Sequence, residues 1–192
     1  MKTLIAMIAC TLLFACEAPK TYTTQALDFT KATPIQVNVA EIRLVESYQS
    51  SNVAPFKEQE FPIPPAAGVK QWLKQRLKAV GTHGVLEMTI DDASVREVGL
   101  QTQAGFIGFI TNDQEARYDA TLHVTARLYD GTNAISAATG DVIVTRSKTI
   151  DEKATVEDRR RLFDDITHDL MQSFDQQMAI RLSKYFSPYL VR

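Results

Sequence analysis

The sequence predicts an α+β fold in two layers: a four-stranded, mainly antiparallel sheet, in the order β-α-β-β-β-α, with both helices on one face. Four segments alternate apolar and polar residues, which is typical of strands with one buried and one hydrated face. Two further segments repeat apolar residues at steps of three and four, which indicates amphipathic helices. The apolar faces of all these elements would meet in a single core.

The first predicted strand covers residues 35–44. Its apolar residues alternate with polar ones in two runs of opposite phase, Ile35, Val37 and Val39, then Ile42 and Leu44. A change of phase requires an extra residue, so we expect a β-bulge near Ala40. Residues 47–65 follow as a long loop, because the four prolines there exclude regular structure.

The first predicted helix begins at Pro65, since proline suits the first helical turn, and ends at Gly81, a C-cap candidate. One face of this helix is apolar and is formed by Val69, Trp72, Leu73, Leu77 and Val80. The other face carries a row of lysines, Lys70, Lys74 and Lys78. A row of ammonium groups can bind the phosphates of lipid head groups, and a solvated helix face is the alternative.

Three more strands are predicted in the second half of the chain. The second strand covers residues 86–100 and is interrupted at Asp91-Asp92. The third, residues 118–128, has the most regular alternation in the sequence. The fourth covers residues 135–150, and we expect a bulge in it at Gly140.

The last predicted element is a long helix. Thr155 and Asp158 nearly match a capping box, with Asp in place of Glu, and Ser187-Pro188 ends the helix. A continuous apolar stripe runs along it, formed by Leu162, Phe163, Ile166, Leu170, Phe174, Met178, Leu182 and Tyr185. We expect this stripe to form one side of the core.

The N-terminus has the features of an export signal. Lys2 supplies a positive charge, and the apolar run 4–14 follows it. This run is too short to span a bilayer, which requires about 20 residues. It ends in Leu13-Phe14-Ala15-Cys16, a tetrad that resembles the lipobox of bacterial lipoproteins.

The lipobox resemblance implies cleavage before Cys16 and acylation of its thiol and of the new amino group. We therefore expect residues 1–15 to be a signal peptide, residues 16–33 a lipidated tether, and residues 34–192 a single α+β domain. A plain secreted protein with a chance cysteine is the alternative. Among lipoproteins of enteric bacteria, Asp after the acylated cysteine is the inner-membrane retention signal, so Glu17 favours the outer membrane.

Composition agrees with export and limits the possible partners. Of the two cysteines, Cys10 lies in the signal peptide, so Cys16 would be the single cysteine of the processed chain, and lipidation accounts for it. Loss of Lys2 leaves 20 basic residues against 23 acidic ones, a formal charge of −3. This balance provides no basic excess for binding nucleic acid.

A wider resemblance rests on the order of these features. The first helix reads Trp72-Leu73-x-x-Arg76-Leu77-x-x-x-Gly81, the second strand contains Ile90-x-x-Ala93-x-Val95, and the third begins at Tyr118. With the lipobox, the tether and the closing helix, this pattern resembles small, mostly uncharacterised Gram-negative envelope lipoproteins. The architecture is also similar to the lipopolysaccharide-assembly lipoprotein that plugs an outer-membrane barrel, and to the auxiliary lipoproteins of lipid-transporting ABC systems. The resemblance implies the periplasmic side of the outer membrane and supplies no catalytic residue.

The sequence contains few candidate reactive groups. The sequence contains none of the standard motifs of serine hydrolases, zinc proteases, P-loop proteins or dinucleotide-binding proteins. Asp164 and His168 are four residues apart on the closing helix, a spacing that metal ligands use, but a solvated polar pair on the face away from the core is the simpler interpretation. We therefore expect no enzymatic reaction, no metal and no cofactor.

One segment outside the regular elements is unusually apolar. The connection between the second and third strands contains Phe106, Ile107, Phe109 and Ile110 around Gly108. Exposed apolar patches mark partner or membrane contacts, so we predict such a contact here. The alternative is that the segment extends the strands or packs onto the core.

Three functions compete on these grounds. The favoured one is a lipid-anchored, non-enzymatic accessory module that binds an envelope protein or lipid during outer-membrane assembly or lipid transport. The second is a lipoprotein that binds lipids or glycolipids without a fixed protein partner. The third is an enzyme, which the absence of a nucleophile–base pair disfavours.

Overall fold

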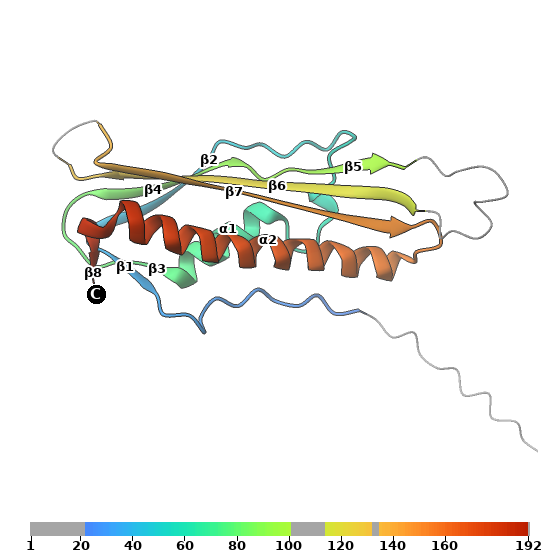
Figure 1. Cartoon of the computed structure of the whole chain (residues 1–192), viewed down its shortest axis with the longest axis horizontal. Helices are drawn as coiled ribbons and strands as arrows, with labels where there is room; N and C mark the ends of the chain where they lie inside the picture. The colour runs from blue at the N-terminus through green and yellow to red at the C-terminus, as the bar shows by residue number, and fades with distance from the viewer. Residues whose placement is uncertain (1–21, 101–113, 132–134, 192) are drawn as a thin grey trace, which may run out of the picture.

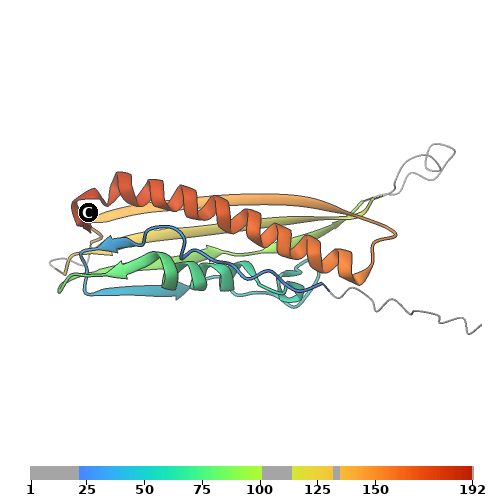
Figure 2. The same ribbon diagram turned by 90° about the horizontal axis from the view of Figure 1, so that it is seen from below.

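The computed structural model describes residues 22–100, 114–131 and 135–191, which form an elongated two-layer α+β structure (Figure 1). Two helices, α1 (Pro65–Arg76) and α2 (Val156–Tyr185), cover one face of the main sheet, as predicted (Figure 2). The main sheet has five strands, which are β2 (Glu41–Glu46), β4 (Val85–Asp92), β5 (Val95–Gly99), β6 (Gln114–Tyr129) and β7 (Ala138–Asp151).

The predicted number of four strands is wrong because the second predicted strand is divided. Strands β4 and β5 pair with successive parts of the same edge of β6, opposite residues 123–129 and 116–120, while β7 pairs with the other edge. The pairing register shifts at Ile90–Asp92, and the side chain of Asp92 accepts a hydrogen bond from the Ser94 amide at 2.9 Å. This local turn interrupts the ladder, so one long predicted strand becomes two.

The sheet is also mixed rather than antiparallel throughout. Strand β2 runs parallel to β4, and the chain between them crosses over through α1, as parallel neighbours require. The first predicted strand is divided between two sheets, because its first part joins a small sheet of three short strands. These strands are β1 (Ile35–Val37), β3 (Leu77–Ala79) and β8 (Leu190–Val191).

Helix α1 ends earlier than predicted. It stops at Arg76, and Leu77 is already extended and begins β3, so Lys78 does not belong to the helix. The role predicted for Gly81 as a helix cap is therefore wrong. Instead, Gly81 lies against the backbone of Asn38, where an added Cβ would be 2.6 Å from the Asn38 carbonyl carbon. Glycine is required by this close approach of two chain segments.

Helix α2 agrees closely with its prediction. Thr155 and Asp158 form the capping box, with hydrogen bonds of 2.9 and 3.1 Å between each side chain and the other residue's amide. Tyr185, the last predicted member of the apolar stripe, is 42% exposed. Most of the stripe is buried in the core, namely Phe163, Ile166, Leu170, Phe174, Met178 and Leu182.

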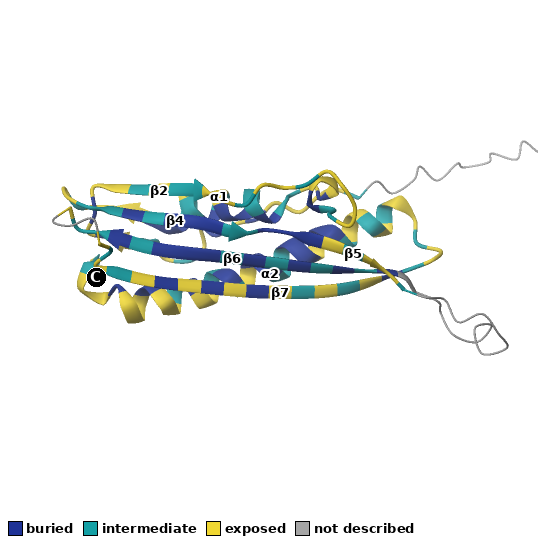
Figure 3. Cartoon of the chain, turned by 90° about the horizontal axis from the view of Figure 1, so that it is seen from above, coloured by how far each residue is buried: buried dark blue, intermediate teal, exposed yellow. Residues whose placement is uncertain are grey.

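The layers meet through alternating side chains. Buried and exposed residues alternate along most of β7 (Figure 3). Because successive side chains of a strand point to opposite faces, the exposed ones lie on the face away from the helices. No bulge forms at Gly140, which keeps its register opposite Ala126. The ring of Phe186 packs there, 3.4 Å from where a Cβ would lie, so Gly140 provides space for an aromatic residue.

The proline-rich loop before α1 is fixed to the sheet through one buried carboxylate. Tyr48 and Ser50 both donate hydrogen bonds of 2.6 Å to Glu58, and the amide of Val95 in β5 donates to its other oxygen at 3.2 Å. Burial raises the pKa of the Glu58 carboxyl, but the hydrogen bonds from Ser50 and Tyr48 outweigh it and hold this pKa below its usual value.

Truncation of Phe174 tests the predicted core. Phe174 is fully buried and its ring meets that of Trp72 edge to face, with centroids 4.9 Å apart. We expect Phe174→Ala to lower the free energy of unfolding by about 3–5 kcal/mol, because it leaves a cavity. Ile180 on the same helix is 66% exposed, so Ile180→Ala is the control and should change little. Equal urea midpoints for the two variants would contradict this packing.

Candidate functional site

Part of the segment predicted as a lipidated tether is packed onto the domain. Residues 22–33, called the strap below, lie between α1 and α2 on the side of the helix layer away from the sheet (Figure 2). The strap has no regular secondary structure. It directly precedes Pro34 and β1, so it connects the predicted acylation site to the first strand.

The strap is extended and buries alternate residues. Leu27 and Phe29 are 4% and 9% exposed, whereas Ala26, Asp28 and Thr30 face solvent. This spacing of two is typical of an extended peptide with one face against a surface. The side chain of Leu27 lies over α1, near a glycine that leaves room for it.

Side chains of α1 bind the strap through its backbone. Gln75 accepts a hydrogen bond from the amide of Phe29 at 2.9 Å, and Gln71 donates one to the carbonyl of Leu27. The two glutamines are one helical turn apart and therefore lie on the same face of α1. Because they contact peptide groups, they recognise an extended backbone whatever side chains it carries.

Side chains of α2 bind the strap in the same way. Asp164 accepts from the amide of Gln25 at 3.3 Å, and His168 donates to the Gln25 carbonyl at 2.9 Å. The interpretation of this pair as solvated and facing away from the core is wrong, since Asp164 is 2% exposed. Burial, together with a hydrogen bond to Asp164, raises the pKa of Tyr22 to about 12.

A buried ion pair joins both helices and the end of the strap. Arg76 of α1 lies 2.7 Å from Asp175 of α2, and Trp72 donates to the same carboxylate oxygen at 2.7 Å. Arg76 also donates to the carbonyl of Thr33. The side chain of Arg76 is 8% exposed, so its charge is compensated almost entirely by these partners.

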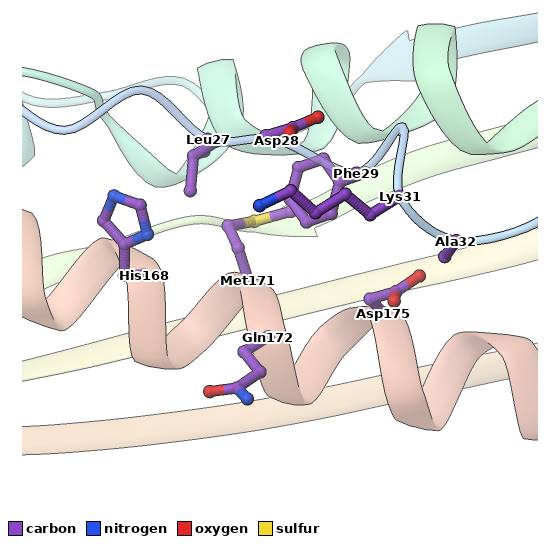
Figure 4. Close-up of a pocket in the computed structure, with 9 residues that line it drawn as sticks. All are labelled: Leu27, Asp28, Phe29, Lys31, Ala32, His168, Met171, Gln172 and Asp175. Atoms are coloured by element: carbon purple, nitrogen blue, oxygen red, sulfur yellow. The ribbon is translucent and has the colours of Figure 1, made fainter.

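A cavity of about 300 Å³ remains beside the strap (Figure 4). Met171 and His168 point from α2 toward the strap, whereas Gln172 points away from it. The cavity is amphiphilic, because apolar side chains and charged groups both line it. Its lining comes from the strap and α2 and comprises Leu27, Asp28, Phe29, Lys31, Ala32, His168, Met171, Gln172 and Asp175.

Of the residues predicted to make contacts, the structure describes the three lysines alone, and none of them lines this cavity. Cys16 and the apolar segment containing Phe106, Ile107, Phe109 and Ile110 lie outside the described residues. The lysines do not form one row on a helix: Lys70 pairs with Glu46 at 2.9 Å, Lys74 is exposed on α1, and Lys78 is exposed on β3.

The described part of the chain comprises residues 22–100, 114–131 and 135–191. None of its helices is long and apolar enough to cross a membrane. Within it, no three His, Cys, Asp or Glu side chains are grouped so that they could hold a metal ion.

Comparisons with known proteins concern the fold. No protein-family model matches the sequence, and no curated protein matches it. A minor lipoprotein from Acinetobacter baumannii is similar over 81% of this chain and 98% of its own, at 12% identity and a TM-score of 0.42. Uncharacterized lipoprotein B from Nitrosomonas europaea is similar over 78% and 88%, at 13% identity and a TM-score of 0.43. Rare lipoprotein B from Shewanella oneidensis is similar over 72% and 93%, at 14% identity and a TM-score of 0.36.

All three of these proteins are bacterial lipoproteins by name, the class that this sequence resembles. The three TM-scores are below 0.5, so neither a site nor an activity is transferred from these proteins. The candidate site therefore rests on the residues of this chain.

Sequence reasoning missed the residues that bind the strap. Gln71 and Gln75 are spaced four apart on α1, beside the core residue Trp72, and this spacing was a usable signal. The pair Leu27 and Phe29 is a shorter signal, because an alternation of two residues is too brief to predict burial.

Replacement of Arg76 tests the junction of the helices and the strap. We expect Arg76→Met to lower the free energy of unfolding by about 3 kcal/mol, because it leaves the charge of Asp175 without its ion pair. The pair of Arg43 and Glu41 is a matched control, since both side chains are about half exposed. Arg43→Met should cost less than about 1 kcal/mol in the same denaturation measurement. If both variants lose the same stability, the buried pair does not hold the junction.

Proposed function

We propose that this chain is a lipid-anchored, non-enzymatic accessory module of the Gram-negative cell envelope. Cys16 anchors it to the periplasmic face of the outer membrane, and the domain binds an envelope protein during outer-membrane assembly or lipid transport. The observation that carries the proposal is the strap: the chain just after the predicted acylation site occupies a groove whose side chains recognise peptide backbone.

The position of the strap supports an anchor close to the domain. Five residues separate Cys16 from Tyr22, so the lipid-bearing residue lies within about 20 Å of the docked strap. Tyr22 stacks beneath Arg161, with the guanidinium 5.3 Å from the ring centroid, near the start of α2. The end of the molecule where α2 begins would therefore face the membrane (Figure 1).

The chemistry of the groove favours a protein partner over a lipid. Its hydrogen-bonding side chains come from both helices and face the amide and carbonyl groups of an extended chain. An acyl chain has no such groups. The cavity of about 300 Å³ is at the lower end of the range for drug-sized ligands, and a lipid with two acyl chains is larger than these.

Replacement of Cys16 tests the anchor. Wild-type protein should fractionate with membranes, and globomycin, which blocks lipoprotein signal peptidase, should cause the unprocessed form to accumulate. The Cys16→Ser variant should be released into the soluble fraction, because a diacylated cysteine is needed for stable attachment. Cys10→Ser is the control and should behave as wild type. Equal solubility of wild type and Cys16→Ser, with processing unaffected by globomycin, would exclude a lipoprotein.

Purification from detergent-solubilised membranes tests the partner class. A C-terminally tagged wild-type chain should bring down one envelope protein in stoichiometric amount, and Cys16→Ser should bring down much less. Lipid analysis of the same eluate is the second measurement. Stoichiometric lipid without a protein would contradict the accessory role and support a lipid-binding lipoprotein.

A further inference from the structure

We infer that the groove between α1 and α2 is a binding site for an extended peptide of a partner protein, and that the strap is its displaceable occupant. The peptide carries two apolar side chains spaced two residues apart, as Leu27 and Phe29 are. This inference deepens the proposed function and rests on it for the identity of the partner as an envelope protein.

The recognition chemistry between Gln25 and Phe29 is general rather than specific to the strap's sequence. Four hydrogen bonds reach the strap at Gln25, Leu27 and Phe29, and each is made to a backbone amide or carbonyl. Any extended chain presents the same groups at the same two-residue spacing. Selectivity then comes from the two apolar positions, which face the groove.

The strap fills the groove incompletely. The second carboxylate oxygen of Asp164 is buried and has no hydrogen-bond partner among the described residues, so an acceptor remains unused. The cavity of about 300 Å³ leaves room beside Phe29 and Met171. Methionine adapts its shape to different neighbours, so a larger side chain can be accommodated there. A partner peptide that supplies a donor to Asp164 and fills this cavity would bind better than the strap does.

The surface of α1 that contacts Leu27 is also suited to a side chain from outside the helix layer. Leu27 lies over Gly68 of α1, where an added Cβ would come within 3.2 Å of the leucine and 2.9 Å of Met171. Any larger residue at position 68 would occupy the space that now receives leucine. The groove floor is therefore open because α1 has a glycine here.

Displacement of the strap would change the reach of the anchor. With the strap docked, five residues separate Cys16 from the domain, a span of at most about 20 Å. With the strap released, residues 17–33 all become linker, and the span to Pro34 grows to about 60 Å. Partner binding in the groove would thus allow the domain to move away from the membrane while it stays attached.

A peptide-binding experiment tests the inference without a membrane, so its result is independent of acylation. The probe is a fluorescein-labelled peptide with the sequence of residues 22–33, and the protein is the purified full-length chain. In the variant Leu27→Ser/Phe29→Ser the strap loses its two buried side chains and leaves the groove. We expect the probe to bind this variant at least about tenfold more tightly than it binds wild type, whose own strap competes.

Matched controls identify the contacts. Ala26→Ser/Thr30→Ser alters exposed strap positions, so this chain should exclude the probe as wild type does. The variant Leu27→Ser/Phe29→Ser is called the open variant. A probe with serine in place of Leu27 and Phe29 should not bind it. Adding Gln71→Ala/Gln75→Ala to the open variant should weaken binding roughly tenfold or more, since two hydrogen bonds to the peptide are lost. Fluorescence of Trp72, the single tryptophan, monitors folding in each variant.

Hydrogen exchange in the wild-type chain provides a test without substitutions. The amide of Phe29 should exchange through a local opening while the amides of β6 stay protected. Exchange of Phe29 only together with β6 would overturn the inference, because the strap would then be part of the core. It would also be overturned if the open, folded variant failed to bind the probe, or if wild type formed a strap-dependent dimer, in which a second copy is the occupant.

Discussion

The guanidinium of Arg76 holds the two helices together and joins the end of the strap to them. It pairs with Asp175 of α2 at 2.7 Å and donates to the carbonyl of Thr33 at the end of the strap. A buried cation is unfavourable without a counter-charge, which Asp175 supplies, and the Thr33 carbonyl adds a further hydrogen bond. Helices α1 and α2 must therefore come together around Arg76, and the end of the strap is fastened to the same group. The chain also turns into β3 directly after this residue, so the small sheet is positioned from the same point.

The elements that the sequence predicted well are those with long, regular patterns. The closing helix has eight apolar residues at helical spacing and a capping pair, Thr155 and Asp158, and its ends agree with the structure. The third predicted strand, residues 118–128, lies within β6, where alternation continues over many residues. In both elements the local preference and the tertiary environment favour the same conformation, so the pattern alone was sufficient.

The parts that were missed depend on contacts between distant segments. Strands β2 and β4 pair in parallel, as two strands joined through a helix commonly do. Periodicity within a strand does not report the direction of the strand, so the alternation pattern alone does not predict this pairing. The sequence indicates a tether at residues 22–33, because only Leu27 and Phe29 alternate in this polar stretch. It indicates a solvent-exposed Asp164, because the segment that covers this residue lies about 140 residues earlier in the chain.

The contacts of Arg76 also explain how a strap can leave without unfolding the domain. Ordering the backbone costs about 1–2 kcal/mol per residue in conformational entropy. The strap offsets this cost by burying only two large apolar side chains, those of Leu27 and Phe29. The strap is therefore one of the less stable parts of the molecule. When it leaves, Arg76 loses the carbonyl of Thr33 but keeps Asp175, and the edge-to-face contact of Trp72 with Phe174 is unaffected. The helix pair thus stays closed by its own contacts, and a preformed groove is presented to the next occupant.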